Sequence, residues 1–162
     1  MKEVAILLLL ALLLNGCGST RTLQSTTGGI WQAQLFGGSG EASGFSFITQ
    51  FTLNDNNSLN PLFLQFLNQN PCFTLNGPKV SGMIQNYVVN TDDTVTGTLV
   101  FTVTSGSNIL TLTGPLTGTA TVTGTPPNTS TTLTSASIAG NWMLSGGSGC
   151  NAAGGSFTMT ES

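Results

Sequence analysis

Apolar and polar residues alternate along most of the chain after residue 30, which is the period-two pattern of β-strands with one buried face. The first two strands would each turn one apolar face inward, formed by Trp31, Ala33 and Leu35 and by Phe45, Phe47, Phe51 and Leu53. The glycine-rich residues 37–44 separate these two stretches. A short glycine-rich link between two strand patterns predicts a hairpin loop.

Residues 59–67 depart from this period. Their apolar side chains follow the i, i+3, i+4, i+7, i+8 spacing of an amphipathic helix, at Leu59, Leu62, Phe63, Phe66 and Leu67. Asn60 and Pro61 stand where a helix takes its N-cap and its first residue, and Asn70-Pro71 would end it. We therefore predict one short helix here.

Strand patterning resumes with Val80–Val89, where Gly82 would produce a bulge. Residues 94–104 and 110–123 alternate apolar or small residues with threonine, which predicts strands with one apolar and one threonine face. The segment Ser105–Asn108 between them predicts a turn.

The remaining sequence predicts a linker at Pro126–Thr132 and two closing strands near 138–144 and 156–160. About eight short strands joined by short turns favour an all-β fold, an antiparallel barrel or sandwich with one short helix. Gly-x-Trp followed by Gly-Gly-Ser-Gly occurs twice, from Gly29 and from Gly140, which suggests one hairpin design at both ends of the sheet.

The N-terminus carries an apolar run from Val4 to Leu14. At about 1.5 Å per helical residue it would reach roughly 16 Å, about half of a bilayer's hydrocarbon core. Lys2 precedes the run, although Glu3 dilutes its charge. A basic start, a short apolar core and a small residue before a cut site predict a cleaved signal peptide.

The residues that follow the run, Leu14-Asn15-Gly16-Cys17, resemble the lipobox of bacterial lipoproteins. The resemblance implies that residues 1–16 are removed and that Cys17 receives a diacylglyceryl thioether and then an N-acyl chain. Gly18, in place of aspartate, implies sorting to the outer membrane. The alternative is an ordinary signal peptide followed by an incidental cysteine. Residues 17–28, which are small and polar, would form a lipidated flexible tether before a β domain at 29–162.

With Cys17 assigned to lipid by this resemblance, Cys72 and Cys150 remain as a pair in a compartment that permits disulfides. We expect a structural disulfide that stabilises the domain by roughly 4 to 5 kcal/mol on the chain-entropy model. The alternative, a metal or redox pair, would lack both histidine and a C-x-x-C motif.

Charged residues make up 6% of the chain, and the net charge of −3 offers no electrostatic footprint for nucleic acid. The chain has no histidine, so the usual activating base and the commonest metal ligand are both missing. The adjacent Asp92 and Asp93 are typical of a turn. Asn54–Ser58 offers alternating oxygen ligands, as a calcium loop does, but also has the composition of a solvated turn. We therefore expect no enzymatic activity, metal or cofactor.

Gly29-Ile30-Trp31 at the start of the first strand, with a disulfide from mid-chain to the C-terminal region, resembles the lipocalins. The resemblance implies a barrel whose cavity binds a small apolar molecule. The candidate cavity residues are Trp31, Phe45, Phe47, Phe51 and Trp142, which would otherwise be plain core residues. The threonine rows favour an ordinary solvent face over a recognition face.

These observations favour a membrane-anchored, non-catalytic envelope or cell-surface lipoprotein that acts as an interaction or structural domain. Its expected partner is the membrane, through lipid on Cys17, and no partner protein can be named from the sequence. The alternative function is a lipocalin-like carrier of a small apolar ligand.

Overall fold

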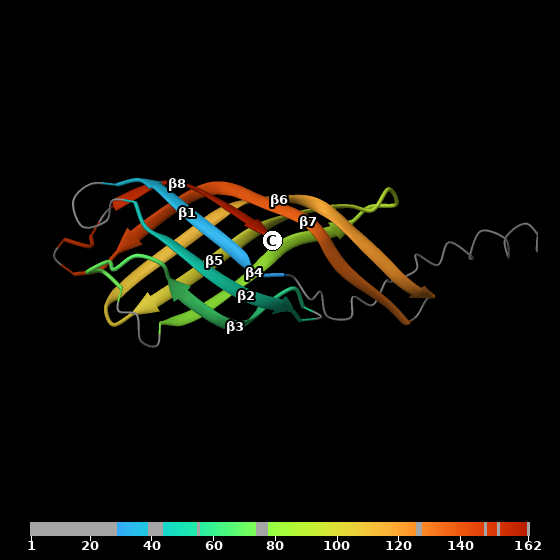
Figure 1. The fold of residues 1–162 in the computed structure, drawn as a ribbon, viewed down its shortest axis with the longest axis horizontal. Coiled ribbons are helices and arrows are strands. Elements are labelled where there is room, and N and C mark those ends of the chain that lie inside the picture. The colour runs from blue at the N-terminus through green and yellow to red at the C-terminus, as the bar shows by residue number, and fades with distance from the viewer. Residues whose placement is uncertain are drawn as a thin grey trace, which may run out of the picture.

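The computed structural model describes residues 29–38, 44–54, 56–73, 78–125, 128–147, 149–151 and 153–161. The signal peptide, the lipidation site at Cys17 and the tether predicted for residues 1–28 lie outside these ranges. Eight strands make up the regular structure of the described residues (Figure 1): β1 (Trp31–Gly37), β2 (Ser46–Leu53), β3 (Leu59–Phe66), β4 (Lys79–Val89), β5 (Thr94–Ser105), β6 (Asn108–Thr125), β7 (Asn128–Ser145) and β8 (Ala153–Glu161).

The strands form one antiparallel sheet in the order β3-β2-β1-β8-β7-β6-β5-β4, which curls into a nearly closed barrel (Figure 1). Neighbours in the chain are neighbours in the sheet, except that β1 pairs with β8 and β3 does not form a ladder with β4. One bridge, Ser58 with Met83, and one hydrogen bond, from Ile84 N to Asn57 O at 2.9 Å, connect these last two strands. The all-β prediction is confirmed, and the barrel is the correct alternative.

The predicted helix is wrong, because residues 59–66 form strand β3. Antiparallel pairing with β2 satisfies the main-chain groups on one edge of this segment, and the ladder shifts register between Gln50 and Phe51, where Leu62 has no partner. Leu59 and Phe66 are both buried in the barrel, because the register shift at Leu62 changes the alternation of faces between them. A helix this short is marginal in water, so the available ladder outweighs the helical spacing.

Two further expectations need correction. Gly82 pairs regularly with Phe101, whereas the bulge of β4 lies between Gln85 and Val88 and places Asn86 at a φ of 52°. The expected linker at 126–132 is largely strand, because β6 runs to Thr125 and β7 begins at Asn128. Threonine's strong β propensity extends this pair of strands, although residues 126 and 127 lie outside the described part.

The interior of the barrel is occupied by aromatic side chains. The rings of Phe47 and Phe101, from strands that are not neighbours in the sheet, stack at 5.9 Å between centroids. Phe45 likewise meets Trp142 at 6.0 Å. Such contacts between non-adjacent strands run through the lumen, so side chains fill it where these rings meet.

Glycines on the inner face make room for these rings. Leu99 lies opposite Gly114 on β6, and Gly140 on β7 lies opposite Phe157 on β8. The two glycines face each other so closely that a Cβ on Gly140 would overlap the carbonyl oxygen of Thr113. Large and small residues therefore alternate around the wall, as the taper of a small barrel requires.

Because every turn reverses the chain, the loops gather at two ends of the barrel. One end, named here the disulfide pole, carries the β1–β2, β3–β4, β5–β6 and β7–β8 connections. The opposite end, named the terminal pole, carries Gly29, Glu161, the β2–β3 and β4–β5 turns and the long β6–β7 hairpin (Figure 1). The ends of the described chain thus lie together, far from the disulfide.

Candidate functional site

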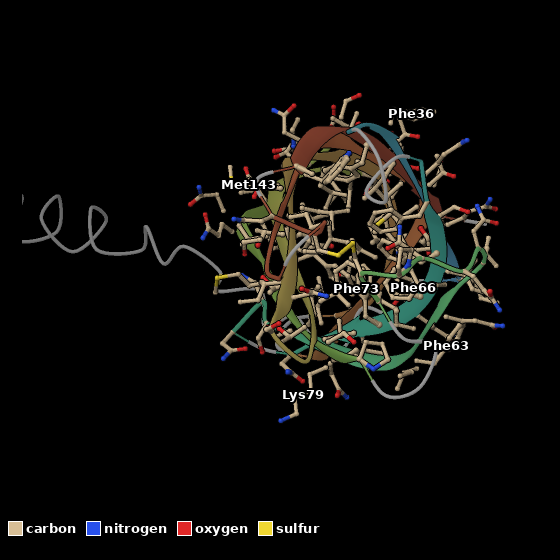
Figure 2. All side chains as sticks on the ribbon, turned by 90° about the vertical axis from the view of Figure 1, so that its left-hand side faces the viewer. Phe36, Phe63, Phe66, Phe73, Lys79 and Met143 are labelled. Atoms are coloured by element: carbon tan, nitrogen blue, oxygen red, sulfur yellow. A yellow bond between two sulfur atoms is a disulfide. The ribbon has the colours of Figure 1, made fainter. Side chains whose placement is uncertain are left out.

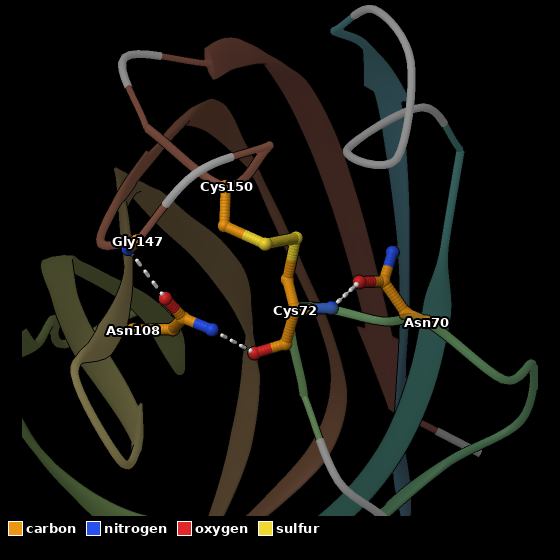
Figure 3. Close-up of a disulfide and its surroundings, with 5 residues drawn as sticks. All are labelled: Asn70, Cys72, Asn108, Gly147 and Cys150. Atoms are coloured by element: carbon orange, nitrogen blue, oxygen red, sulfur yellow. Dashed lines mark hydrogen bonds between the residues drawn. A yellow bond between two sulfur atoms is a disulfide. The ribbon is translucent and has the colours of Figure 1, made fainter.

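Cys72 and Cys150 meet at the disulfide pole (Figure 3). Their sulfur atoms are 2.08 Å apart and their Cα atoms 5.6 Å apart, which is the geometry of a disulfide bond. Both cysteines are buried. The expected pairing of these two cysteines is confirmed, and the bond joins the β3–β4 connection to the β7–β8 loop.

The β3–β4 connection folds inward as a plug. Asn70-Pro71-Cys72-Phe73 forms a tight turn in which Phe73 N donates to Asn70 O at 3.1 Å and Cys72 N donates to Asn70 Oδ1 at 2.8 Å (Figure 3). Phe73 is buried, and its ring lies 5.1 Å from that of Phe66 and 5.8 Å from that of Phe45. In Figure 2, which looks onto this pole, the Phe66 and Phe73 side chains point into the barrel. The plug therefore closes part of this end.

Asn108 joins three loops at the same pole. Its Nδ2 donates to Cys72 O at 2.7 Å, and its Oδ1 accepts from Gly147 N at 3.0 Å (Figure 3). Asn108 itself begins β6 after a two-residue turn whose first residue, Gly106, has a φ of 60°. One side chain thus ties the β5–β6 turn to the plug and to the β7–β8 loop.

All five predicted cavity or core residues are buried inside the barrel: Trp31, Phe45, Phe47, Phe51 and Trp142. The structure brings them together in pairs, since the ring of Trp31 stacks on Phe51 at 5.4 Å and Phe45 meets Trp142. Trp142 Nε1 donates to Phe36 O at 2.8 Å, whereas Trp31 Nε1 is buried without a hydrogen-bond partner in the described structure.

Two hollows are lined by described residues alone, and both open to the surface. One, of about 260 Å³, lies where β1 and β2 separate, beside Phe36 and Asn68. The other, of about 320 Å³, lies on the β6–β7 wall beside Thr111, Asn141 and Met143. In the described part of the chain, the cysteine, aspartate and glutamate residues do not gather into any group of three that could hold a metal ion.

The β2–β3 and β4–β5 turns at the terminal pole share one pattern of hydrogen bonds. In Asn54–Ser58 and in Asn90–Thr94, the first residue's N–H donates to the carbonyl of the last, and the first residue's amide donates to the last hydroxyl. That hydroxyl donates to the third residue, Asn56 or Asp92. The fourth residue is left-handed in both, with a φ of 61° or 64°. The side-chain oxygens of Asn56 and Asp92 thus accept turn hydrogen bonds, whereas Asn57 Oδ1 is buried without a hydrogen-bond partner in the described structure.

Two carboxyl groups at the terminal pole have shifted pKa values. Burial raises the pKa of Glu161, and a hydrogen bond donated by Gly29 N opposes this shift. The pKa of Asp92 is lowered because the Thr94 hydroxyl and N–H donate to its carboxylate. Glu161 ties the start of the described chain to its last strand.

An open seam runs between β3 and β4, and apolar side chains border it. Four of the eight exposed large hydrophobic residues of the described structure lie on or next to these two strands. They are Leu62, Leu67, Met83 and Val88, with exposed fractions of 57%, 46%, 39% and 47%. Charged surfaces and short strands usually protect sheet edges, so this seam is a candidate interaction site.

Sequence reasoning missed this seam because the helical spacing assigned Leu62 and Leu67 to one buried stripe. The strand places Leu59 and Phe66 inside and leaves the other two exposed. The signal was present in Pro61, which is typical of an edge strand. The role of Asn108 had no sequence signal, because its partners lie 36 and 39 residues away.

Comparison with protein-family models, with curated proteins and with solved structures found no match to this chain. The described residues form no helix that is long and apolar enough to cross a membrane.

Proposed function

We propose that the chain is a bacterial lipoprotein, anchored by lipid on Cys17, whose barrel acts as a non-catalytic interaction domain in the cell envelope. The observation that carries the interaction role is the filled interior. Because Phe47 and Phe101 stack across the lumen, a partner has to bind to the outer surface of the barrel or to its edges.

The arrangement of the poles supports an N-terminal anchor. A tether ahead of Gly29 leaves the barrel at the terminal pole, beside Glu161 and opposite the disulfide. Two acyl signals hold a protein firmly to a bilayer, whereas one is marginal. An outer-membrane lipid at Cys17 would then direct the disulfide pole away from the membrane surface.

Metabolic labelling with palmitate tests the anchor. We expect the full chain, expressed in a bacterial host with lipoprotein processing, to take up label and to fractionate with membranes. Cys17→Ser should abolish both, while Ser19→Ala, which leaves the lipobox unchanged, should retain both. Equal labelling of the Cys17→Ser variant would contradict the lipoprotein assignment.

The alternative function, a lipocalin-like carrier, is less well supported because aromatic rings occupy the lumen where its ligand would bind. One observation favours it, namely the buried indole N–H of Trp31 without a described partner. Native mass spectrometry of the full chain separates the two functions. A stoichiometric apolar molecule that co-purifies would support the carrier, and its absence across preparations supports the interaction domain.

A further inference from the structure

The seam between β3 and β4 presents two strand edges that no ladder joins. The sheet ends at these strands, and the Ser58–Met83 bridge lies at the terminal-pole end of β3. From there toward the disulfide pole, no strand among the described residues forms a ladder with the outer edge of β3. An unpaired edge carries a row of N–H and C=O groups that a further strand can satisfy.

Part of the seam carries features that prevent a further strand from pairing with it, and part does not. Pro61 lacks an N–H, Lys79 places a charge at the start of β4, and the bulge after Gln85 distorts the far edge of β4. Residues 62–67, with the sequence Leu-Phe-Leu-Gln-Phe-Leu, contain no proline and no charge. Leu62 lies at the register shift of β3, and residues 63–66 pair with β2 in regular register. The least protected edge is therefore the half of β3 that runs toward the disulfide pole, where Lys79 at the start of β4 is the one charged residue on the two strands.

The side chains of this half also remain available for contact. Leu62 and Leu67 are exposed, and Phe63 and Leu64 are only half-buried, although the segment is almost wholly apolar. Burying such side chains against a partner is favourable because it removes apolar surface from water. The main-chain groups of this edge thus favour an extended partner segment, and its exposed side chains favour apolar residues in that segment.

The lack of charged residues around this edge limits which partner segments can bind. Residues 62–67 contain no charged side chain, and the neighbouring strand β2 contains none either. Apart from Lys79 at the start of β4, a charged segment added here would find no ion-pair partner on the strands beside it, and it would lose hydration. An uncharged segment with alternating apolar residues meets no such cost.

We propose that residues 62–67, which are the second half of β3 and the residue after it, bind an uncharged, extended segment of a partner protein by β-strand addition. The inference rests on the proposed interaction function and names the class of partner. The site lies on the side of the barrel directed away from the chain ends, so a lipid anchor on Cys17 leaves it accessible.

Hydrogen–deuterium exchange of the full chain in detergent micelles tests the proposal with a defined probe. The probe is an acetylated, amidated peptide of eight alternating threonine and valine residues, and its control carries N-methyl groups at every second amide. We expect the first peptide to slow exchange at residues 62–67 but not at 108–113, and the N-methylated peptide to have no effect. Absence of protection at 62–67 would overturn the proposal.

Matched variants locate the contact. Leu62→Lys combined with Leu67→Lys should weaken peptide binding by at least about tenfold, a loss of roughly 1.4 kcal/mol. Ile109→Lys combined with Met143→Lys changes two other exposed apolar residues, which lie outside the seam, and should leave binding within about twofold. Equal weakening by both pairs would contradict a site on β3. Should the lysine pair unfold, Leu62→Ala with Leu67→Ala replaces it.

Sedimentation of the same samples excludes another occupant. If the chain dimerises without peptide and residues 62–67 are already protected, a second copy fills the edge and the assignment to a partner protein is overturned. Palmitate labelling of Cys17 is independent of all these readouts, so failure of the anchor and failure of strand addition are distinguishable.

Discussion

At the scale of single residues, inner-face glycines determine how close the strands of the barrel wall come. Gly114 and Gly140 face each other across β6 and β7, where a Cβ on either would meet main-chain atoms of the other strand. Main-chain atoms cannot move aside as a flexible side chain can. Glycine is needed here for space, since neither residue has a positive φ.

Gly140→Ala should therefore destabilise the barrel by about 1 to 3 kcal/mol, the usual cost of overpacking. Gly147→Ala is the matched control, because its added methyl group would have no neighbour nearer than 3.8 Å. Urea denaturation measures both as a change in midpoint at constant slope. Equal stability of the Gly140→Ala variant and the wild type would show that β6 and β7 can separate locally.

Glu161 predicts a dependence of stability on pH. Burial raises its pKa in the folded state above the ordinary value of 4.5, so ionisation is less favourable in the folded chain than in the unfolded one. The stability contributed by this group should fall as pH rises from about 4.5 through the raised pKa.

The difference in unfolding free energy between wild type and Glu161→Gln, measured from pH 3 to pH 8, isolates this effect. We expect the wild type to lose stability relative to the variant across that window. Asp92→Asn is the control of opposite sign, because a lowered pKa gives stability that is lost as pH falls. A difference for Glu161→Gln that is independent of pH would contradict the assigned shift.

At the scale of elements, alternation of apolar and polar residues was sufficient to predict most of the strands, but not residues 59–66 of β3 or the start of β7 at Asn128. The alternating faces of β1 and β2 are found as expected, because both strands bury one side against the core. The segment of β3 fits two periods, and local sequence cannot show that β2 offers an edge to pair with. Tertiary pairing decided between them.

The shared turn design makes a prediction for the β4–β5 turn. Asp93 is left-handed, with a φ of 64°, and a non-glycine residue there pays a steric cost. Asp93→Gly should therefore be more stable than Asp93→Ala by about 1 kcal/mol in thermal or urea unfolding. The corresponding pair Asn57→Gly and Asn57→Ala should show the same order. A reversed order at both positions would contradict the shared geometry.

At the scale of the whole molecule, the disulfide acts where the sheet is least continuous. The seam separates β3 from β4, and the segment that joins these strands carries Cys72. The pairing of Cys72 with Cys150 could be expected from the cysteine count, but the plug could not. Its position depends on Asn108 and on aromatic contacts distant in sequence.

Replacing both cysteines by serine should lower the unfolding free energy by roughly 4 to 5 kcal/mol, because the bond closes a loop with a sequence separation of 78. Asn108→Ala, which removes two hydrogen bonds but keeps the bond, should cost about 1 to 3 kcal/mol. Urea denaturation under non-reducing conditions compares the three proteins. A larger loss for Asn108→Ala than for the serine pair would show that the hydrogen bonds, rather than the bond, hold the plug.

The pairing of β1 with β8 has a consequence for how the gene for this fold could be rearranged. Gly29 and Glu161 are hydrogen-bonded neighbours, whereas the sheet is interrupted between β3 and β4. A circular permutant of the barrel would join Glu161 to Gly29 by a short linker and begin and end in the β3–β4 connection. It would keep every ladder of the barrel. Its strands would then follow one another in both sequence and space, from β4 through β8 and β1 to β3.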